Sequence, residues 1–335
     1  MTKRKLLILI WLLVALVSSN VNAQEETVDE TYTAPVVYAE PQFETQVTTH
    51  TYAQGLTHED WGSESAEVMD LQLDVYEPID APGNRPAMII IHGGAFRFGS
   101  RDDGRFVRMA EYFASRGWVT ISIDYRLVGD YGTIPQEWQD GIQQFVDPSN
   151  QDTTFAVYAA SRDSKAAVRW LHANADTYQI NTDHVTALGM SAGASLAIML
   201  GTTNADVYRD ELTLEDDPTL ASTNLDQPAD VHTIIALSMT PAANTLIETV
   251  YGIDTYDETD APIMIMNGTE DRLVDIREAE MLRDQYEATG VPYAYYPIEG
   301  AGHSLNMMRA EVNGMLPLEL AFAFVVEQQA LTVED

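Results

Sequence analysis

Short apolar runs alternate with helical patterns along most of this sequence. Six runs of four to six residues are almost wholly apolar, which is typical of strands that are covered on both faces. The runs are Ala87 to Ile91, Val119 to Ile123, Val185 to Leu188, Thr233 to Leu237, Ile263 to Met266 and Tyr293 to Ile298. The helical patterns are Arg105 to Ser115, Ser161 to Tyr178, Ala192 to Gly201, Ile276 to Thr289 and Met308 to Gln329. This alternation predicts an α/β fold with a mostly parallel central sheet between two layers of helices.

The N-terminus has the pattern of a secretory signal peptide. Three basic residues precede the apolar run Leu6 to Val17, and small and polar residues follow up to Ala23. The run has 12 residues, whereas a membrane-spanning helix needs about 20, so an uncleaved anchor is the weaker interpretation. We expect residues 1–23 to be removed after Ala23, leaving a secreted or periplasmic protein without a stable membrane anchor.

We assign the region of alternating strands and helices to a catalytic domain at residues 66–335. The residues before it have a different composition. Residues 24–65 are rich in Thr, Glu and Gln, and we expect an extended N-terminal arm or linker. The alternation of apolar and polar residues from Val68 to Tyr76 then predicts a half-exposed edge strand.

Two long insertions interrupt the strand and helix alternation, at residues 127–160 and 202–230. Insertions beside strand ends often build substrate pockets or lids. The aromatic residues of the first insertion are equally consistent with simple packing onto the domain.

A serine stands in the motif G-x-S-x-G, at Gly189 to Gly193, directly between an apolar run and a helical pattern. On such a tight strand-to-helix turn the hydroxyl is exposed above the sheet. Ser191 is therefore the candidate nucleophile. The motif alone is loose, but its position between strand and helix makes it more specific.

A serine nucleophile needs a histidine base and a carboxylate that orients the histidine. Of the seven histidines, His303 lies in a glycine-rich turn after the last predicted strand, in the chain order Ser, acid, His. The acid should follow the preceding strand, where Glu270, Asp271 and Asp275 compete. Asp271 is favoured because Asp275 lies where a helix cap belongs, and Glu270 is the alternative.

Backbone N–H groups are also needed to bind the oxyanion of a tetrahedral intermediate. His92 to Phe96 follows a predicted strand, and its small residues would let the chain approach a bound carbonyl. We expect the N–H groups of Gly94, Ala95 and Ala192 to form the oxyanion hole. A plain glycine turn is the alternative for the first two.

These motifs together resemble the serine esterases of the α/β-hydrolase fold, and most closely the carboxylesterase and hormone-sensitive-lipase-like branch. His92 to Phe96 resembles its H-G-G-G motif with an alanine in place of the last glycine, and Gly189 to Gly193 resembles its elbow. Asp124 to Leu127 and Ala166 to Leu171 resemble two further motifs of that branch. The chain departs from the branch at Met190, Ala194 and Asn267, which leaves the substrate open.

The resemblance implies a secreted hydrolase of carboxylic esters that acts through Ser191, His303 and Asp271. It implies a small-molecule or polymer-linked ester as the substrate, and the chemistry requires no metal and no organic cofactor. A peptidase or amidase on the same fold would share the acyl chemistry. A non-catalytic binding module is a further alternative, which the complete set of three residues disfavours.

The charge of the chain is strongly acidic, with 52 acidic residues against 18 basic ones. Removal of residues 1–23 would leave 15 basic residues and a net charge of −37, with Lys165 as the single lysine. Such a surface disfavours nucleic-acid binding, which requires Lys and Arg. It favours adaptation to a salty habitat, with an ordinary acidic extracellular enzyme as the alternative.

We predict that the unfolding temperature rises between roughly 0.01 M and 1 M NaCl. Over this range the Debye length falls from about 30 Å to about 3 Å, so repulsion among the acidic side chains is screened. Thermal denaturation followed by circular dichroism measures the rise, with equimolar sucrose as the uncharged control. An unfolding temperature that is independent of NaCl would contradict salt adaptation and leave the esterase hypothesis untouched.

Overall fold

The computed structural model describes residues 33–203, 206–305, 307–308, 311–312 and 314–335. Residues Pro35 to Asp335 form one compact unit. The expected signal peptide at residues 1–23 lies outside the described residues and stays a prediction.

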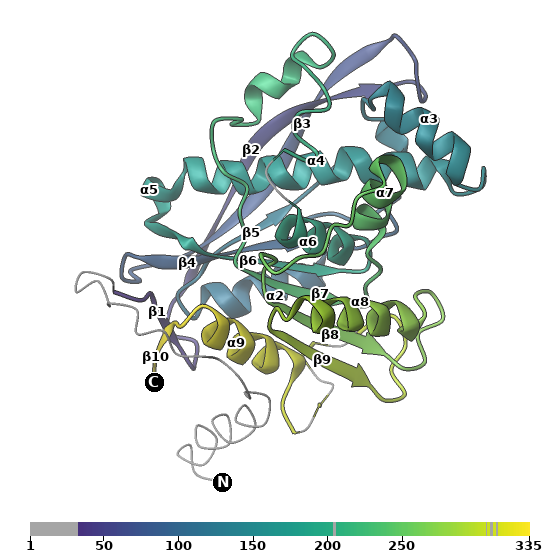
Figure 1. Ribbon diagram of the computed structural model, residues 1–335. Helices are drawn as coiled ribbons and strands as arrows, with labels where there is room; N and C mark the ends of the chain where they lie inside the picture. The colour runs from purple at the N-terminus through teal and green to yellow at the C-terminus, as the bar shows by residue number, and fades with distance from the viewer. Residues whose placement is uncertain (1–32, 204–205, 306, 309–310, 313) are drawn as a thin grey trace. The chain divides into compact units, whose positions relative to one another are not determined.

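An eight-stranded sheet forms the centre of this unit (Figure 1). Across the sheet lie β2 (Thr45–His58), β3 (Ala66–Pro78), β5 (Val119–Ile123), β4 (Arg85–Ile91), β6 (Ile180–Met190), β7 (Thr233–Leu237), β8 (Ile263–Gly268) and β9 (Tyr293–Ile298). The pairs from β5 to β9 are parallel, whereas β3 is antiparallel to both of its neighbours. The chain leaves β4 toward β5 on one side and returns to β6 on the other, so a topological switch point lies beside β4. Open α/β sheets place their sites at such points.

Burial explains why the central strands form where the apolar runs predict them. Every residue of β4, β5, β7 and β8 is buried, so these strands are covered on both faces. The observed α/β fold, a mostly parallel sheet between helices, confirms the predicted class.

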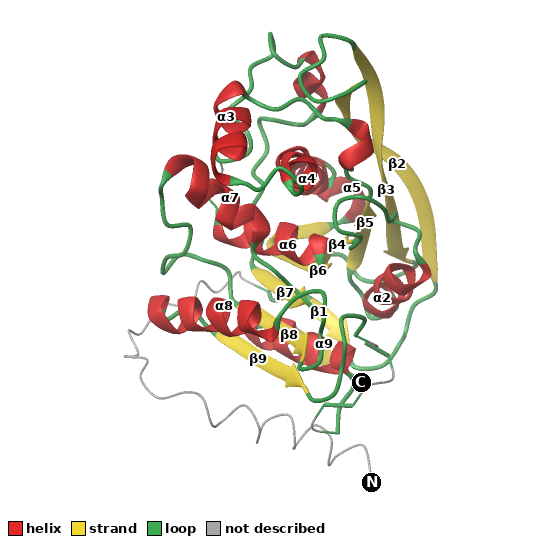
Figure 2. Cartoon of the chain, turned by 90° about the vertical axis from the view of Figure 1, so that its right-hand side faces the viewer, coloured by secondary structure: helices red, strands yellow, loops and turns green. Residues whose placement is uncertain are grey.

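Helices cover both faces of the sheet (Figure 2). One face packs against α2 (Gly104–Ala114) and α9 (Pro317–Gln328), which share an apolar cluster with Met88, Ile90 and Leu188. The other face packs against α4 (Gln151–Ala173), α6 (Ala192–Thr202), α7 (Ala242–Tyr251) and α8 (Ile276–Thr289). The shorter elements are α3 (Gln136–Phe145), α5 (Ala175–Tyr178), η1 (Val128–Asp130) and η2 (Pro218–Ser222).

The expectation of an arm or linker at residues 24–65 is wrong for its described part. β2 lies at the edge of the central sheet and pairs with β3 along almost its whole length, so β3 is not the edge strand. β1 (Val36–Tyr38) pairs in parallel with β10 (Thr332–Glu334) near the C-terminus. An edge strand exposes many of its side chains, and the polar residues of β2 therefore masked its role in the sequence.

Two predicted helices also differ from the structure. The helix expected from Ser161 begins earlier, at Gln151, inside the insertion 127–160, and a cap at Asn174 separates it from α5. The last helix was expected from Met308 but begins at Pro317. Proline is favoured at the first position of a helix because its missing N–H needs no acceptor there.

A buried ion pair fastens the first insertion to the rest of the domain. The Arg126 guanidinium donates to both oxygens of the Asp163 carboxylate, with Nη2 to Oδ1 at 2.7 Å, and Arg126 Nη1 donates to the Leu56 carbonyl at 2.9 Å. The two side chains are only 5% and 3% exposed. The pair thus connects α4, the segment after β5, and β2.

We predict that Asp163→Asn lowers the free energy of unfolding by about 3–5 kcal/mol. The substitution leaves the Arg126 charge buried without its counter-charge, which is the costly way to break a buried pair. Urea denaturation measures the loss. Asp284→Asn, which removes the exposed partner of Arg283, is the matched control and should change stability by less than about 1 kcal/mol. Equal effects of the two substitutions would show that Arg126 finds water or another partner.

Candidate active site

Ser191 lies on a strained turn between β6 and α6. Its φ of 55° and ψ of −119° place it outside the common backbone regions, and its N–H donates to the Leu237 carbonyl at 2.8 Å. A Cβ on Gly189 would lie 2.1 Å from the Gly193 carbonyl oxygen, and one on Gly193 would lie 2.1 Å from that of Ile91. Only glycine fits at both positions. The sequence motif is therefore a steric requirement of this turn.

The structure brings Ser191, His303 and Asp271 together from three distant segments. His303 Nε2 lies 3.0 Å from Ser191 Oγ, and His303 Nδ1 lies 2.8 Å from Asp271 Oδ2. The Asp271 side chain is fully buried, and its Oδ1 accepts N–H groups of Leu273 and Val274 at 2.8 and 3.0 Å. One carboxylate oxygen is thus fixed by the backbone while the other faces the imidazole.

The two competing carboxylates have other positions. Asp275 caps α8 by accepting the Arg277 N–H at 3.0 Å, and the hydrogen bond from the Arg277 side chain lowers the pKa of Asp275 to about 2. Glu270 is exposed. The helix-cap argument from the sequence therefore identified the arrangement that the structure shows.

The expected oxyanion loop lies against the nucleophile. A Cβ on Gly93 would lie 2.8 Å from the Met190 carbonyl oxygen and 3.2 Å from Ser191 Cβ. Gly94 has a φ of 126°, and Ala95 also has a positive φ of 53°. Among the described residues, no acceptor is found for the N–H of Gly94 or Ala95. The Ala192 N–H belongs to the first turn of α6, where helices leave N–H groups unsatisfied.

His92 supports this loop from behind. Its ring stacks on Tyr125 with centroids 4.3 Å apart, and its Nδ1 lies 2.7 Å from the Gly93 carbonyl oxygen. The Tyr125 hydroxyl in turn donates to the His92 carbonyl at 2.8 Å. Burial lowers the pKa of His92, which favours the neutral ring.

Ser238 holds the histidine loop, a contact that the sequence analysis missed. This buried residue follows β7, has a φ of 48°, and donates its hydroxyl to the His303 carbonyl at 2.7 Å. The neighbouring Met239 N–H donates to the Asn267 side chain at 3.4 Å. The sequence shows only that Ser238 directly follows a buried apolar run. It does not show the contact with His303, which lies 65 residues further along the chain.

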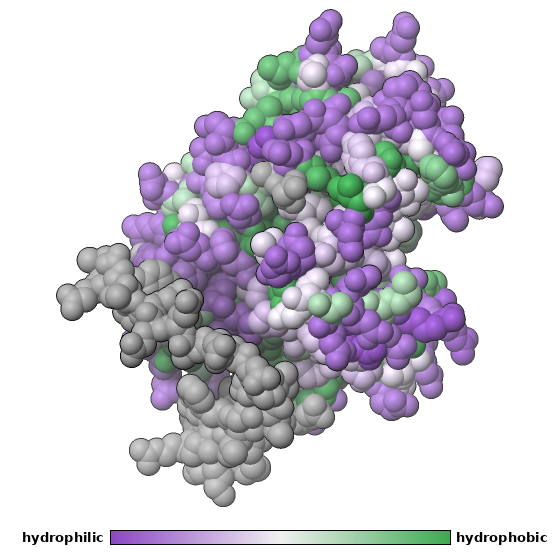
Figure 3. Space-filling view, viewed as in Figure 1, coloured by the Kyte–Doolittle hydropathy of each residue, from purple (hydrophilic) through white to green (hydrophobic). Residues whose placement is uncertain are grey.

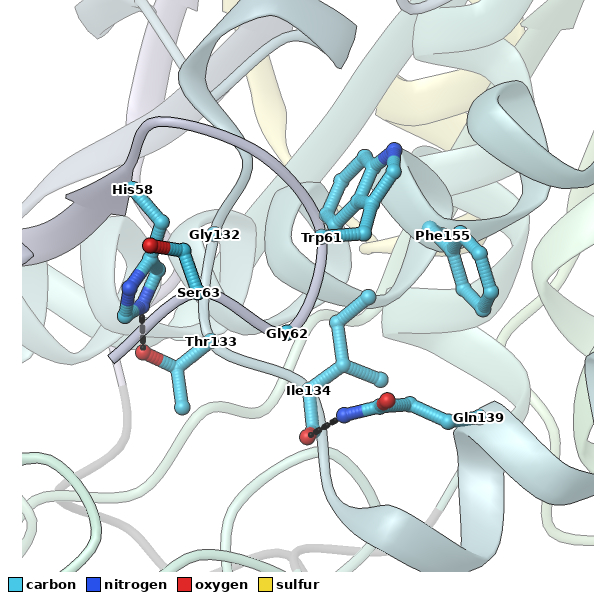
Figure 4. A pocket seen from close by; sticks show the side chains of 9 residues that line it. All are labelled: His58, Trp61, Gly62, Ser63, Gly132, Thr133, Ile134, Gln139 and Phe155. Carbon is cyan, nitrogen blue, oxygen red and sulfur yellow. Dashed lines mark hydrogen bonds between the residues drawn. The ribbon is translucent and has the colours of Figure 1, made fainter. Parts of the chain in front are cut away.

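A pocket of about 160 Å³ opens between the turn after β2 and the first insertion (Figure 4). Trp61, Ile134 and Phe155 form its apolar side, and His58 and Thr133, joined by a 3.0 Å hydrogen bond, form a polar side. Leu73 lies opposite Ile123, the last residue of β5, so residues 66–72 of β3 extend past the carboxyl end of β5 and the turn before β3 lies beyond it. Part of the first insertion thus lines a cavity, whereas its aromatic residues Trp138 and Tyr158 pack into the core. A role of residues 127–160 in binding substrate stays a prediction.

The described residues contain no group of three or more His, Asp or Glu side chains that could hold a metal ion. None of their helices combines the length and apolar character needed to cross a membrane.

The fold and the arrangement of strand ends define an α/β hydrolase. The BD-FAE family model matches residues 73–146 and 149–240. Esterase LipC of Mycobacterium tuberculosis is 24% identical over 280 residues, which cover 76% of this chain and 62% of that protein. The para-nitrobenzyl esterase of Bacillus subtilis is 29% identical over 132 residues, 39% of this chain and 24% of that protein.

Solved structures show the same fold. Esterase 2 of Thermogutta terrifontis, with propionate bound, superposes with a TM-score of 0.60 at 22% identity, covering 88% of this chain and 97% of that one. Its apo form gives a TM-score of 0.59. The chain has the α/β-hydrolase fold and is similar to the BD-FAE family over about half of its length, and it spans less than two thirds of the length of the curated relatives named above.

We predict that Asp271→Asn lowers turnover of an ester by several orders of magnitude, since an amide holds the imidazole in the wrong tautomer. Glu270→Gln and Asp275→Asn are matched controls on the same loop and should retain turnover within about tenfold of the native protein. Steady-state kinetics on each purified variant measures the difference. A comparable loss in Glu270→Gln would move the acid to Glu270.

Proposed function

We propose that this protein is an exported serine hydrolase that cleaves carboxylic esters through a covalent acyl-enzyme. The hydrogen-bonded series Ser191, His303 and Asp271 carries the proposal, because it joins a nucleophile, a base and an orienting carboxylate at hydrogen-bond distance. The names of the relatives, all of them esterases, support the ester as the bond that is cleaved.

In the proposed reaction, Ser191 Oγ attacks the ester carbonyl while His303 Nε2 accepts its proton. The carbonyl oxygen becomes an oxyanion that accepts N–H groups of Gly94, Ala95 and Ala192. These donors are groups of the backbone, so little reorganisation would be needed when the charge develops. His303 then returns the proton to the leaving alcohol. Water, activated by the same histidine, releases the acid and restores Ser191.

The substrate is a small-molecule or polymer-linked ester that enters from the edge where the parallel strands end. The pocket beside Trp61, which is large enough for one ring-sized group, lies beyond the end of β5 on the same side of the sheet. Export is inferred from the signal-peptide pattern of residues 1–23. The hydrophilic side chains that dominate the face in Figure 3 suit a protein that works in open solvent.

We predict that Ser191→Ala lowers ester hydrolysis at least a thousandfold with the fold unchanged, as loss of a triad member typically does. The assay is a panel of p-nitrophenyl esters of increasing chain length beside acetylated and feruloylated sugars. Matching circular dichroism spectra show that the variant is folded. If the variant keeps more than about a tenth of the native turnover, Ser191 is not the nucleophile.

A further inference from the structure

Three basic side chains are buried together on one face of α4, remote from the chemistry of Ser191. Arg162, Lys165 and Arg169 are 5%, 1% and 3% exposed, and their spacing places them on the same side of the helix. α4 starts in the first insertion at the sheet edge of the candidate site and runs back along the sheet. Its basic face contacts the acidic second insertion.

Each of these three cations makes a hydrogen bond to a neutral oxygen. Arg162 Nη1 lies 3.3 Å from the Tyr158 hydroxyl, Lys165 Nζ lies 2.7 Å from the Val207 carbonyl, and Arg169 Nε lies 2.8 Å from the Thr223 carbonyl. Within the described part of the chain, no carboxylate comes within 4.0 Å of Arg162 or Arg169.

Arg169 also has an orphan donor. Its Nη1 is buried and finds no hydrogen-bond partner among the described residues. A buried charged group without its hydrogen bonds is costly, so a guanidinium in this position calls for an acceptor. Arg126 is also buried, but its guanidinium donates to the Asp163 carboxylate, which satisfies both its charge and its hydrogen bonds.

The cations also repel one another. Burial and then the charge of Arg162 lower the pKa of Arg169 to about 10, and burial followed by the charge of Arg169 lowers that of Lys165 to about 7. The nearby Glu211 offsets this charge only in part, because its own burial raises its pKa. A negative charge from outside the chain would relieve the repulsion and satisfy the orphan donor together.

We propose that this cluster is a binding site for a small inorganic anion, namely a halide such as chloride, with Arg169 Nη1 as its central donor. A monoatomic anion accepts hydrogen bonds from any direction. It therefore suits these donors, which come from three side chains and have no common plane that would match the oxygens of a polyatomic anion. Asp210 and Glu211 lie close enough to act on the cluster, and they would repel a larger or doubly charged anion. The bound anion would fasten the second insertion to α4.

The first test separates anion binding from general screening. Chloride is exchanged for gluconate at a constant ionic strength of about 0.5 M, which keeps the Debye length fixed. At roughly five times its dissociation constant, chloride should raise the unfolding temperature of the native protein by about 1.5–2 °C in a saturable manner. Arg169→Gln should lose this dependence, whereas the matched control Arg283→Gln, on the exposed face of α8, should keep it.

The second test does not depend on the stability of a variant. Crystals of the native protein soaked in sodium bromide should show an anomalous peak within hydrogen-bond distance of Arg169 Nη1. A water molecule at that position, with bromide only on the protein surface, would overturn the proposal. So would equal unfolding temperatures in chloride and gluconate. Neither test uses catalysis, so the outcome is independent of the proposed esterase function.

Discussion

The close approach of α6 to the end of β4 determines where the candidate site can form. Gly193 lies so near the Ile91 carbonyl that any side chain would collide with it. This contact places the start of α6, which follows the nucleophile, directly against the backbone at the end of β4. Because Ser191 and the donors of Gly94 and Ala95 directly follow the paired strands β6 and β4, their relative position follows from the sheet. A larger residue at either elbow glycine would therefore displace the nucleophile and the oxyanion donors at the same time.

The sequence predicts the parts of the fold that are buried on both faces. β5 and β7 have the bounds expected from the apolar runs, because a strand between two helical layers must be apolar. The partly buried edge strand β9 and helix α8 also have their expected bounds. β2 escaped notice for the opposite reason. Its stability comes from pairing with β3 and from a few inward residues such as Tyr52, while its outward residues are polar. α7 was missed because nothing in the local pattern separates it from the loop before it.

The site shows the same division between local and tertiary information. Ser191, His303 and Asp271 could be proposed from turns, strand ends and chain order, since each is placed by its own strand. The supports of the site could not. Ser238 reaches the His303 carbonyl because β7 and β9 lie on either side of β8, and His92 stacks on Tyr125 because β5 lies beside β4. These contacts are made between segments, so no spacing in the sequence reveals them.

The distribution of charge completes this physical picture. Among the described residues six cations are buried, namely Arg85, Arg116, Arg126, Arg162, Lys165 and Arg169. Five carboxylates are buried, namely those of Asp74, Asp163, Asp217, Asp260 and Asp271. Buried cations cannot neutralise the exterior, so the surface is more acidic than the composition alone indicates. Salt can therefore act on this protein in two ways. It screens the exterior in proportion to ionic strength, and its anions can enter the interior at α4, where Arg169 provides a donor that the chain itself does not satisfy. The first effect depends on ionic strength alone, and the second depends on which anion the salt contains.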